Sequence, residues 1–189
     1  MKKISLLTLV FIMGLISCKN EKKNTETIQV ETIENQVAEP KSITIELSPK
    51  SDSSVSGTVI FTEKEGVVSM LATVSGLEPG EHAIHIHESS DCSSADGKST
   101  GGHWNPTNQP HGKWGVETGY HKGDIGNFTA DENGDASISI STNEWCIDCD
   151  DETKNIIGKG IIVHAGVDDF TTQPTGDAGG RVSCGGIIQ

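Results

Sequence analysis

Aromatic and basic residues are scarce in this sequence. Phe, Trp and Tyr make up only 4% of the 189 residues, so a folded core must rely on small and branched side chains. Fourteen basic residues face 27 acidic ones, which gives a formal net charge of −13, and Arg181 is the only arginine. Because contacts with phosphate groups need clustered lysine and arginine, this balance argues against nucleic acid as a partner.

The sequence also has no apolar run of membrane-spanning length. The run over 4–16 has 13 residues, and a helix needs roughly 20 to cross a bilayer. Lys2 and Lys3 precede the run, as is typical of a secretory signal. Its end, Leu15-Ile16-Ser17-Cys18, resembles a bacterial lipobox, which implies cleavage before Cys18 and acylation of its thiol. An ordinary signal peptide with a chance cysteine is the alternative.

These features divide the chain into three parts. Residues 1–17 are predicted to be a lipoprotein signal peptide, which is removed on export. Residues 18–41 are polar and charged with little to bury, which indicates a flexible tether behind the lipidated Cys18. Residues 42–189 hold 8 basic and 22 acidic residues, so the predicted domain carries a charge of −14.

A sustained helical periodicity is absent from the domain, and an alternation with period two dominates. Turn residues such as Glu65-Gly66 and Asn133-Gly134 separate the alternating segments. The pattern predicts an all-β fold, an eight-stranded antiparallel sandwich or barrel. Its strands are expected at 43–47, 55–61, 67–74, 82–87, 125–129, 136–140, 160–164 and 181–188. Three long connections, 88–123, 143–158 and 165–180, interrupt the rhythm, and loops of this length are often functional.

Five cysteines leave an even number once Cys18 is lipidated. In an exported protein an even number indicates disulfide bonds, and four cysteines allow three different pairings. The four are Cys92, Cys146, Cys149 and Cys184.

All seven histidines lie in the predicted domain. His85 and His87 are two residues apart on a predicted strand, so both imidazoles project from the same face. His82 has the opposite parity and is not expected to join them. Two imidazoles on one face make half of a metal site that suits copper or zinc.

A long connection supplies further ligand types. Spacings of 8, 10 and 3 residues match neither a helix face nor a hairpin, so they indicate a loop folded around a ligand; exposed histidines without a ligand are the alternative. Three imidazoles and one carboxylate would complete a tetrahedral zinc site. They come from His103, His111, His121 and Asp124. His164 ends another strand and could reach back toward the first pair.

Six segments together carry a resemblance to a known family. They are EHAIHIHE with Cys92 after it, GGHWNP, HGKWG, GYHKGDIGN, IIVHAGVDD and the C-terminal GDAGGRVSCGGI. In this order they resemble the copper/zinc superoxide dismutases, and the leader suggests a bacterial member of the lipoprotein type. The similarity runs from about Ser42 to Ile188. It implies a Greek-key arrangement of the eight strands, with long metal-binding and electrostatic loops.

The resemblance also implies roles for individual residues. One copper per subunit would bind His85, His87, His103 and His164, and one zinc His103, His111, His121 and Asp124. His103 would bridge the two metals and deliver protons, and Arg181 would attract the anionic substrate; these two are the expected catalytic residues. Asp168 would orient one ligand of each metal, and His82 would support the site from outside the ligand sets. Cys92 and Cys184 would form a disulfide bond.

The segment around Cys146 and Cys149 has no counterpart in the family's core. Three interpretations are open: a small local disulfide bond, half of a metal site that needs two more ligands, or a thioredoxin-like redox pair. The last lacks the βαβ context that such motifs have.

These observations lead to one functional hypothesis and two alternatives. The sequence is expected to encode a superoxide dismutase for antioxidant defence, exported to the cell envelope and anchored through Cys18 in the periplasm or at the outer-membrane surface. Its partners would be superoxide and the lipid membrane, and a homodimer is left open. A copper or zinc storage protein would be expected to lose some ligands or Arg181, yet all are retained. A purely structural adhesion sandwich leaves the seven histidines unexplained.

Overall fold

The computed structural model of the protein describes residues 39–189. The predicted leader at 1–17, lipidation at Cys18 and most of the tether lie outside the described residues. Within 39–189, no helix has the length and apolar character needed to cross a membrane. The tether was predicted to end at Lys41, but Lys41 already belongs to the first strand and pairs with Glu63 of the second.

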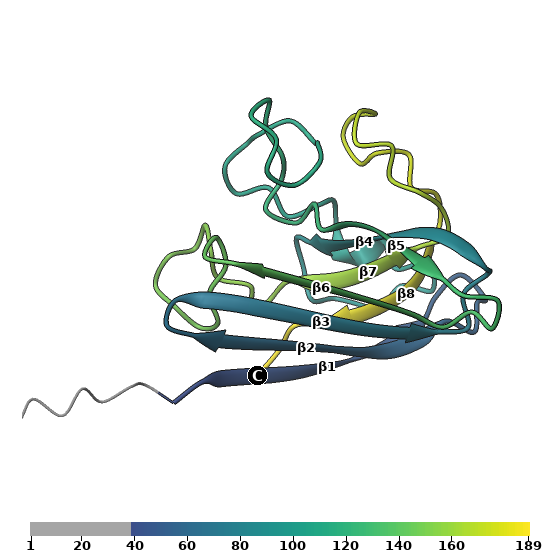
Figure 1. The fold of residues 1–189 in the computed structure, drawn as a ribbon, viewed down its shortest axis with the longest axis horizontal. Coiled ribbons are helices and arrows are strands. Elements are labelled where there is room, and N and C mark those ends of the chain that lie inside the picture. Colours follow the sequence, from purple (N-terminus) through teal and green to yellow (C-terminus); the bar gives the residue numbers. More distant parts are fainter. Residues whose placement is uncertain (1–38) are drawn as a thin grey trace, which may run out of the picture. The chain divides into compact units, whose positions relative to one another are not determined.

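The described residues form eight strands and one short 3-10 turn (Figure 1). The strands are β1 (Lys41–Pro49), β2 (Ser56–Lys64), β3 (Val67–Ser75), β4 (Gly80–His87), β5 (Gly126–Ala130), β6 (Ala136–Thr142), β7 (Gly160–His164) and β8 (Arg181–Gly186). All pairings are antiparallel, in the order β5-β4-β7-β8-β1-β2-β3-β6. The predicted all-β, eight-stranded antiparallel fold is therefore confirmed.

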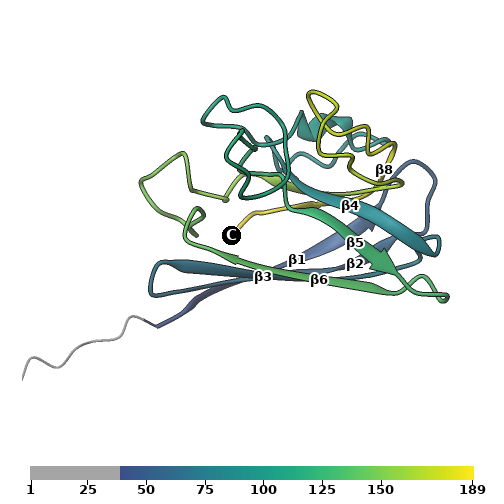
Figure 2. The same ribbon diagram turned by 45° about the horizontal axis from the view of Figure 1, so that its top comes forward.

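The strands lie in two layers around the core. In Figure 2, β1, β2, β3 and β6 lie on one side, and β4, β5 and β8 on the other. The end of β1 joins the layers, because Ser48 and Pro49 pair with Cys184 and Ser183 of β8. The long connections 88–125 and 165–180 both rise from the β4 side (Figure 1).

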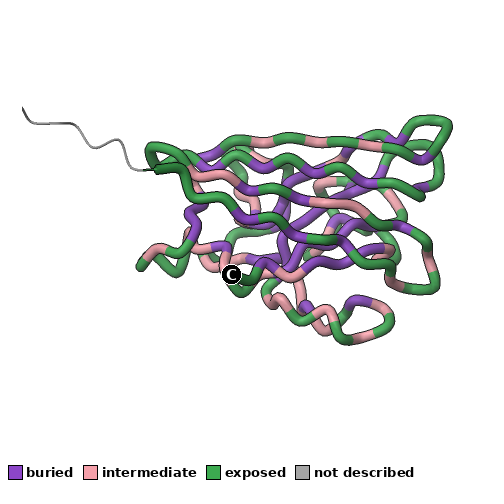
Figure 3. The backbone as a smooth tube through the Cα atoms, turned by 90° about the horizontal axis from the view of Figure 1, so that it is seen from below, coloured by how far each residue is buried: buried purple, intermediate pink, exposed green. Residues whose placement is uncertain are grey.

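Alternation along β3 shows why the chain folds this way. Val68, Met70 and Ala72 are buried between the layers, whereas Leu71 between them is exposed. Figure 3 shows the same alternation of buried and exposed residues along neighbouring strands. The core contains few large rings, Phe61 among them, in keeping with the low aromatic content.

Strand β4 is buried on both faces, unlike β3. Every residue from His82 to His87 is buried. Ile84 and Ile86 belong to the core between the layers, whereas His85 and His87 project from the opposite face, beneath the long connections. The site therefore lies between the outer face of β4 and the connections that cover it.

Several strand ends differ from the predicted boundaries, and one short 3-10 turn was not predicted, whereas the predicted turn at Glu65-Gly66 is present. β2 continues to Lys64 and meets β3 through Glu65-Gly66, whose φ angles of 53° and 76° are those of a two-residue hairpin turn with both central residues left-handed. β8 ends at Gly186, one residue after which the amide of Ile187 still donates to the carbonyl of Lys159, next to β7, at 2.8 Å. The 3-10 turn η1 (Lys98–Thr100) was not predicted, since three residues are too few to show a period.

Two disulfide bonds join the four cysteines of the described region. Cys92, in the connection after β4, is bonded to Cys184 of β8. Their Cα atoms are 5.9 Å apart, and the two residues are 92 positions apart in sequence. Cys146 is bonded to Cys149 in the connection after β6. This pairing selects one of the three that the cysteine count allowed, and it favours the local disulfide bond over a metal half-site at Cys146.

Candidate metal centre

Two sets of buried ligand-type residues share one histidine. In each set, one potential ligand atom per residue lies within 4.8 Å of all the others. The all-histidine set consists of His85, His87, His103 and His164. The carboxylate set consists of His103, His111, His121 and Asp124. The structure thus brings together every residue that the sequence suggested as a metal ligand, and His103 belongs to both sets.

The all-histidine set presents four ring nitrogens that have no hydrogen-bond partner. They are Nδ1 of His85 and Nε2 of His87, His103 and His164. The other nitrogen of three of these rings is held by oxygen: His85 Nε2 lies 2.8 Å from Asp168 Oδ2, His87 Nδ1 3.0 Å from Gly101 O, and His164 Nδ1 3.4 Å from Gly179 O. A neutral imidazole that donates from one nitrogen has a lone pair on the other. These contacts therefore orient the lone pairs toward one another.

The carboxylate set is organised around Asp124. Its Oδ1 lies 2.8 Å from His103 Nδ1, and its Oδ2 lies 3.0 Å from His111 Nδ1. His121 Nδ1 is 3.3 Å from Oδ1, and the backbone amide of His121 donates to Oδ2 at 2.8 Å. All four side chains are buried. His103 consequently faces one set with Nε2 and the other with Nδ1.

Asp168 connects the two sets from outside them. Its Oδ2 accepts from His85 of the all-histidine set, and its Oδ1 lies 2.9 Å from His111 of the carboxylate set. Gly176 passes directly over this carboxylate with a φ of +70°, and a Cβ at that position would collide with Asp168 and His111. A glycine is required there by both the close approach and the left-handed backbone.

Burial determines the protonation of the shared and outer histidines. It lowers the pKa of His103 to about 4, despite the opposing effect of Asp124. It also lowers the pKa of His87 and of His164 well below the ordinary value, and neighbouring histidines add to this effect. Because a metal ligand must be a neutral imidazole, these three rings are ready to bind at neutral pH.

In the carboxylate set, Asp124 and Asp168 oppose the effect of burial on the pKa of a histidine. Burial lowers the pKa of His111, but hydrogen bonds with Asp124 and Asp168 raise it to about 9. Burial raises the pKa of Asp124, but hydrogen bonds from the surrounding histidines outweigh it and hold that pKa far below its ordinary value. Without a metal, the carboxylate set therefore pairs the ionised Asp124 with a protonated His111. A metal ion bound there would displace this proton, because a ligand imidazole must be neutral.

His82 joins neither set. Its Nδ1 lies 3.0 Å from the backbone carbonyl of His164, and its Nε2 lies 2.8 Å from the carbonyl of Glu78. The strand parity predicted this separation. His82 therefore contacts the backbone of His164 and makes no hydrogen bond to the His164 imidazole.

A cavity of about 280 Å³ leads to the all-histidine set. His87, His164 and Arg181 line it, together with Lys98. The guanidinium of Arg181 donates to the carbonyls of Gly97 and Gly101 at 2.9 and 2.8 Å, which fixes it at the wall of the cavity. The sequence pointed to Arg181 but gave no signal for Lys98, which begins the unpredicted 3-10 turn η1 directly after Gly97.

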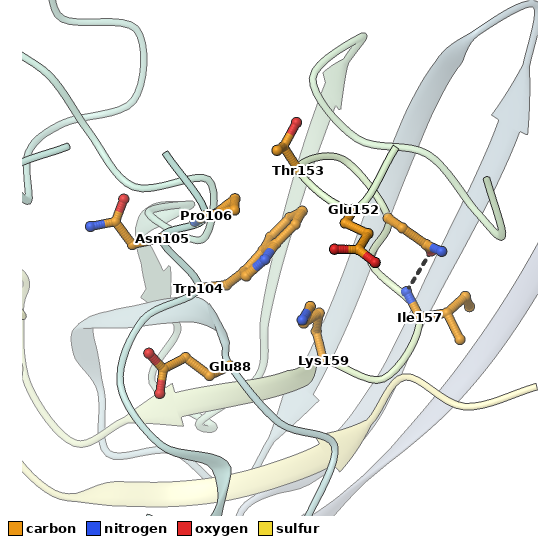
Figure 4. Close-up of a pocket in the computed structure, with 9 residues that line it drawn as sticks. Glu88, Trp104, Asn105, Pro106, Glu152, Thr153, Ile157 and Lys159 are labelled. Atoms are coloured by element: carbon orange, nitrogen blue, oxygen red, sulfur yellow. Dashed lines mark hydrogen bonds between the residues drawn. The ribbon is translucent and has the colours of Figure 1, made fainter. Parts of the chain in front are cut away.

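A second cavity, of about 520 Å³, lies on another side of the connection. Figure 4 shows Trp104 in it, with Lys159 and Glu152 to one side. Lys159 Nζ is 5.7 Å from the centre of the Trp104 ring. No residue of the two sets lines this cavity. The cavity with Arg181 is the one that reaches the all-histidine set.

The donor atoms fit metal ions. Six buried histidine nitrogens without a partner converge from β4, β7 and the long connection, and buried polar atoms in native proteins are otherwise almost always paired. Four nitrogens in one set, and nitrogens with a carboxylate in the other, are donor sets that transition metals and zinc prefer.

Comparison with known proteins agrees with this geometry. The family model described as copper/zinc superoxide dismutase matches residues 55–187. The chain belongs to the copper/zinc superoxide dismutase family. Members of this family are oxidoreductases, and the eight-stranded barrel and the two histidine sets fit it.

A solved structure is similar over most of the chain. It is the crystal structure of a double mutant of a SOD-like protein from Bacillus subtilis, in which a tyrosine and a proline are replaced by histidine. The two chains are 28% identical, the match covers 77% of this chain and 97% of that chain, and the TM-score is 0.67. Two features of this superoxide dismutase could not be predicted from the sequence. They are the position of Lys98 at the cavity and the contacts that Glu144 and Trp145 make with the metal-site loop.

Proposed function

We propose that the protein converts two superoxide anions and two protons into oxygen and hydrogen peroxide, with copper in the all-histidine set and zinc in the carboxylate set. The observation that carries the proposal is His103, buried between the two sets with one ring nitrogen directed to each. In this position, His103 would link the copper, which transfers electrons, to the zinc, which would hold the His103 ring in place.

Access distinguishes the two sets. His87 and His164 border the cavity that contains Arg181, whereas His111, His121 and Asp124 do not. A redox metal needs contact with the substrate, and copper with imidazole ligands cycles between two oxidation states. Zinc has no redox chemistry and suits a closed set with a carboxylate. We therefore assign copper to the set that the substrate reaches.

The side chains contribute binding, orientation and a proton. Copper, when bound, supplies the one-electron steps that oxidise one superoxide and reduce the next. His103 Nε2, directed to the all-histidine set, accepts a proton and returns it to the reduced product. Asp124 Oδ1 lies 2.8 Å from the opposite nitrogen, Nδ1. A zinc ion held by both residues would keep the His103 ring in position while Nε2 changes protonation.

Arg181 attracts the substrate in a protein whose overall charge opposes it. The domain carries −14, which repels an anion at long range. Arg181 provides a fixed positive charge at the cavity wall, next to His87 and His164. A guanidinium also donates hydrogen bonds to a small anion, which orients it for electron transfer.

Replacing Arg181 with isoleucine is expected to lower the second-order rate constant roughly tenfold at low ionic strength. The loss should shrink as salt rises, because salt screens the attraction. Pulse radiolysis across a salt series measures both effects. Arg181→Lys should retain part of the rate, and Lys64→Gln, a distant exposed position on β2, should change it little. An unchanged rate in Arg181→Ile would show that this residue does not attract superoxide.

The activity itself is tested by loading the purified protein with copper and zinc and counting both metals by atomic absorption. We expect one copper and one zinc per chain and rapid decay of superoxide. Protein that binds both metals without accelerating the decay would support the storage alternative instead.

We also propose that the enzyme is exported and anchored in the cell envelope by a lipid on Cys18. The basic, apolar and small-residue order of 1–18 supports this location, and two disulfide bonds suit an oxidising compartment. Expression of the full chain should place it in the membrane fraction with a mass increase from acylation, and Cys18→Ser should move it to the soluble fraction. An unacylated, soluble wild-type protein would contradict the anchor.

A further inference from the structure

Two residues just after β6 contact the loop that carries the carboxylate set. Glu144 and Trp145 belong to the connection 143–159, which the sequence could not relate to the family's core. Their contacts fall on Tyr120 and Lys122, the two neighbours of His121. His121 therefore lies between two residues that are held from outside its own loop.

The carboxylate of Glu144 binds both neighbours. Tyr120 donates its hydroxyl to Oε1 at 2.6 Å, and Lys122 donates its ammonium to Oε2. Burial raises the pKa of Glu144, but hydrogen bonds from Lys122 and Tyr120 outweigh this and hold that pKa below its ordinary value. Glu144 is thus an ionised acceptor with both oxygens in use.

Trp145 holds the backbone of the same loop. Its indole nitrogen donates to the carbonyl of Lys122 at 2.9 Å, and the side chain is only 1% exposed. Its ring meets Trp114 edge-on at 5.2 Å between centres, and Trp114 in turn lies 5.1 Å from the ring of Tyr120. The loop between His111 and His121 is therefore packed against Trp145 as well as hydrogen-bonded to it.

The segment that carries these two residues is itself fixed to the barrel. The amide of Glu144 donates to Thr142 Oγ1 at the end of β6. The amide of Ile147 donates to Glu63 Oε2 at 2.9 Å, which ties the segment to β2. The Cys146–Cys149 disulfide bond begins one residue after Trp145 and closes the chain into a small ring there.

We propose that Glu144 and Trp145 are positioning residues for the carboxylate set, and that the Cys146–Cys149 disulfide bond keeps them in place. They touch no ligand atom, and they act by fixing Tyr120 and Lys122 on either side of His121. The choice of zinc as the probe rests on the proposed function, whereas the positioning itself rests on the contacts of this chain. Contacts that orient metal ligands usually change metal affinity when they are removed, and Glu144 and Trp145 orient His121 through its two neighbours.

The proposal is tested with Glu144→Gln, Trp145→Phe and the double variant Cys146→Ser/Cys149→Ser, each loaded with copper and zinc. Glu144→Gln removes the charge and keeps the shape, and Trp145→Phe removes the indole donor and keeps a ring. We expect zinc to pass to a chromogenic chelator about tenfold faster in each of the first two variants, with a smaller increase in the serine variant. The visible spectrum of the bound copper should stay unchanged.

The matched control is Glu152→Gln, which removes one carboxylate from the same connection. Glu152 is exposed and makes no hydrogen bond to Tyr120 or Lys122. A general loss of stability would accelerate release of both metals, whereas a positioning role accelerates zinc alone. Equal zinc release in wild type, Glu144→Gln and Trp145→Phe would overturn the proposal.

Hydrogen exchange of the metal-free proteins separates this proposal from the proposed function. Backbone amides of 119–123 should exchange faster in Glu144→Gln and Trp145→Phe than in wild type and Glu152→Gln, while those of β4 should not change. If wild type binds no zinc but this difference is seen, the zinc assignment fails and the positioning role stands. Unchanged exchange at 119–123 refutes the positioning role whatever metal the protein binds.

Discussion

Replacing Cys92 and Cys184 together by serine is expected to lower the free energy of unfolding by about 4.6 kcal/mol. The bond joins residues 92 apart in sequence. A closed loop of that length removes much of the freedom of the unfolded chain, and the effect grows with the logarithm of loop length. Both cysteines also come from the parts that frame the site, the connection after β4 and strand β8. Urea unfolding of the metal-free protein, followed by circular dichroism, measures the change.

The second disulfide bond provides the comparison. Cys146 and Cys149 are only three residues apart, and the same relation gives about 2 kcal/mol for so short a loop. The serine variant of this pair should therefore lose about half as much stability as the variant lacking the long-range bond. Equal losses in the two variants, or a larger loss at the short loop, would disprove loop closure as the source of the stabilisation.

Changing Asp124 to asparagine is expected to weaken zinc binding by more than about 100-fold. The carboxylate lies within 3.3 Å of nitrogens from all three histidines of its set. Asparagine retains the shape but removes the negative charge, and it offers one oxygen where the carboxylate offers two. Competition with a zinc chelator gives the affinity, and atomic absorption gives the copper content, which should stay near one per chain.

Asp135→Asn is the matched control for that substitution. Asp135 is exposed in the turn between β5 and β6, so the variant removes one carboxylate far from the ligand sets. Its zinc affinity should equal that of wild type. If Asp124→Asn binds zinc as tightly as the control, Asp124 is not a ligand, and the assignment of zinc to the carboxylate set fails.

The strands could be predicted because each leaves a local trace. In β3 the alternation of Val68 and Met70 with exposed residues follows directly from one buried face. The same alternation placed His85 and His87 together and set His82 apart. Strand ends leave a weaker trace: β2 runs three residues past the end of its apolar pattern, because pairing with β3 continues through polar residues.

The connections leave no such trace. Spacing suggested that His103, His111 and His121 surround a ligand, but the course of an irregular loop does not follow from spacing. The resemblance to the family supplied that course. The contacts of Glu144 with Tyr120 and Lys122 span 24 and 22 residues between two connections. Contacts between two irregular connections produce no periodic pattern and no motif in the sequence, so only the folded structure reveals them.

The burial of β4 on both faces divides the site into two cooperative units. His85 and His87 stand on a strand enclosed by the core and by the connections, and His164 ends the neighbouring strand β7. The donors on these strands come apart only when the barrel itself unfolds. His111, His121 and Asp124 all lie on one irregular connection, and such segments open locally at a lower free energy than the whole domain. We therefore expect a metal bound by the carboxylate set to exchange through a local fluctuation, while three of the four donors of the all-histidine set remain assembled.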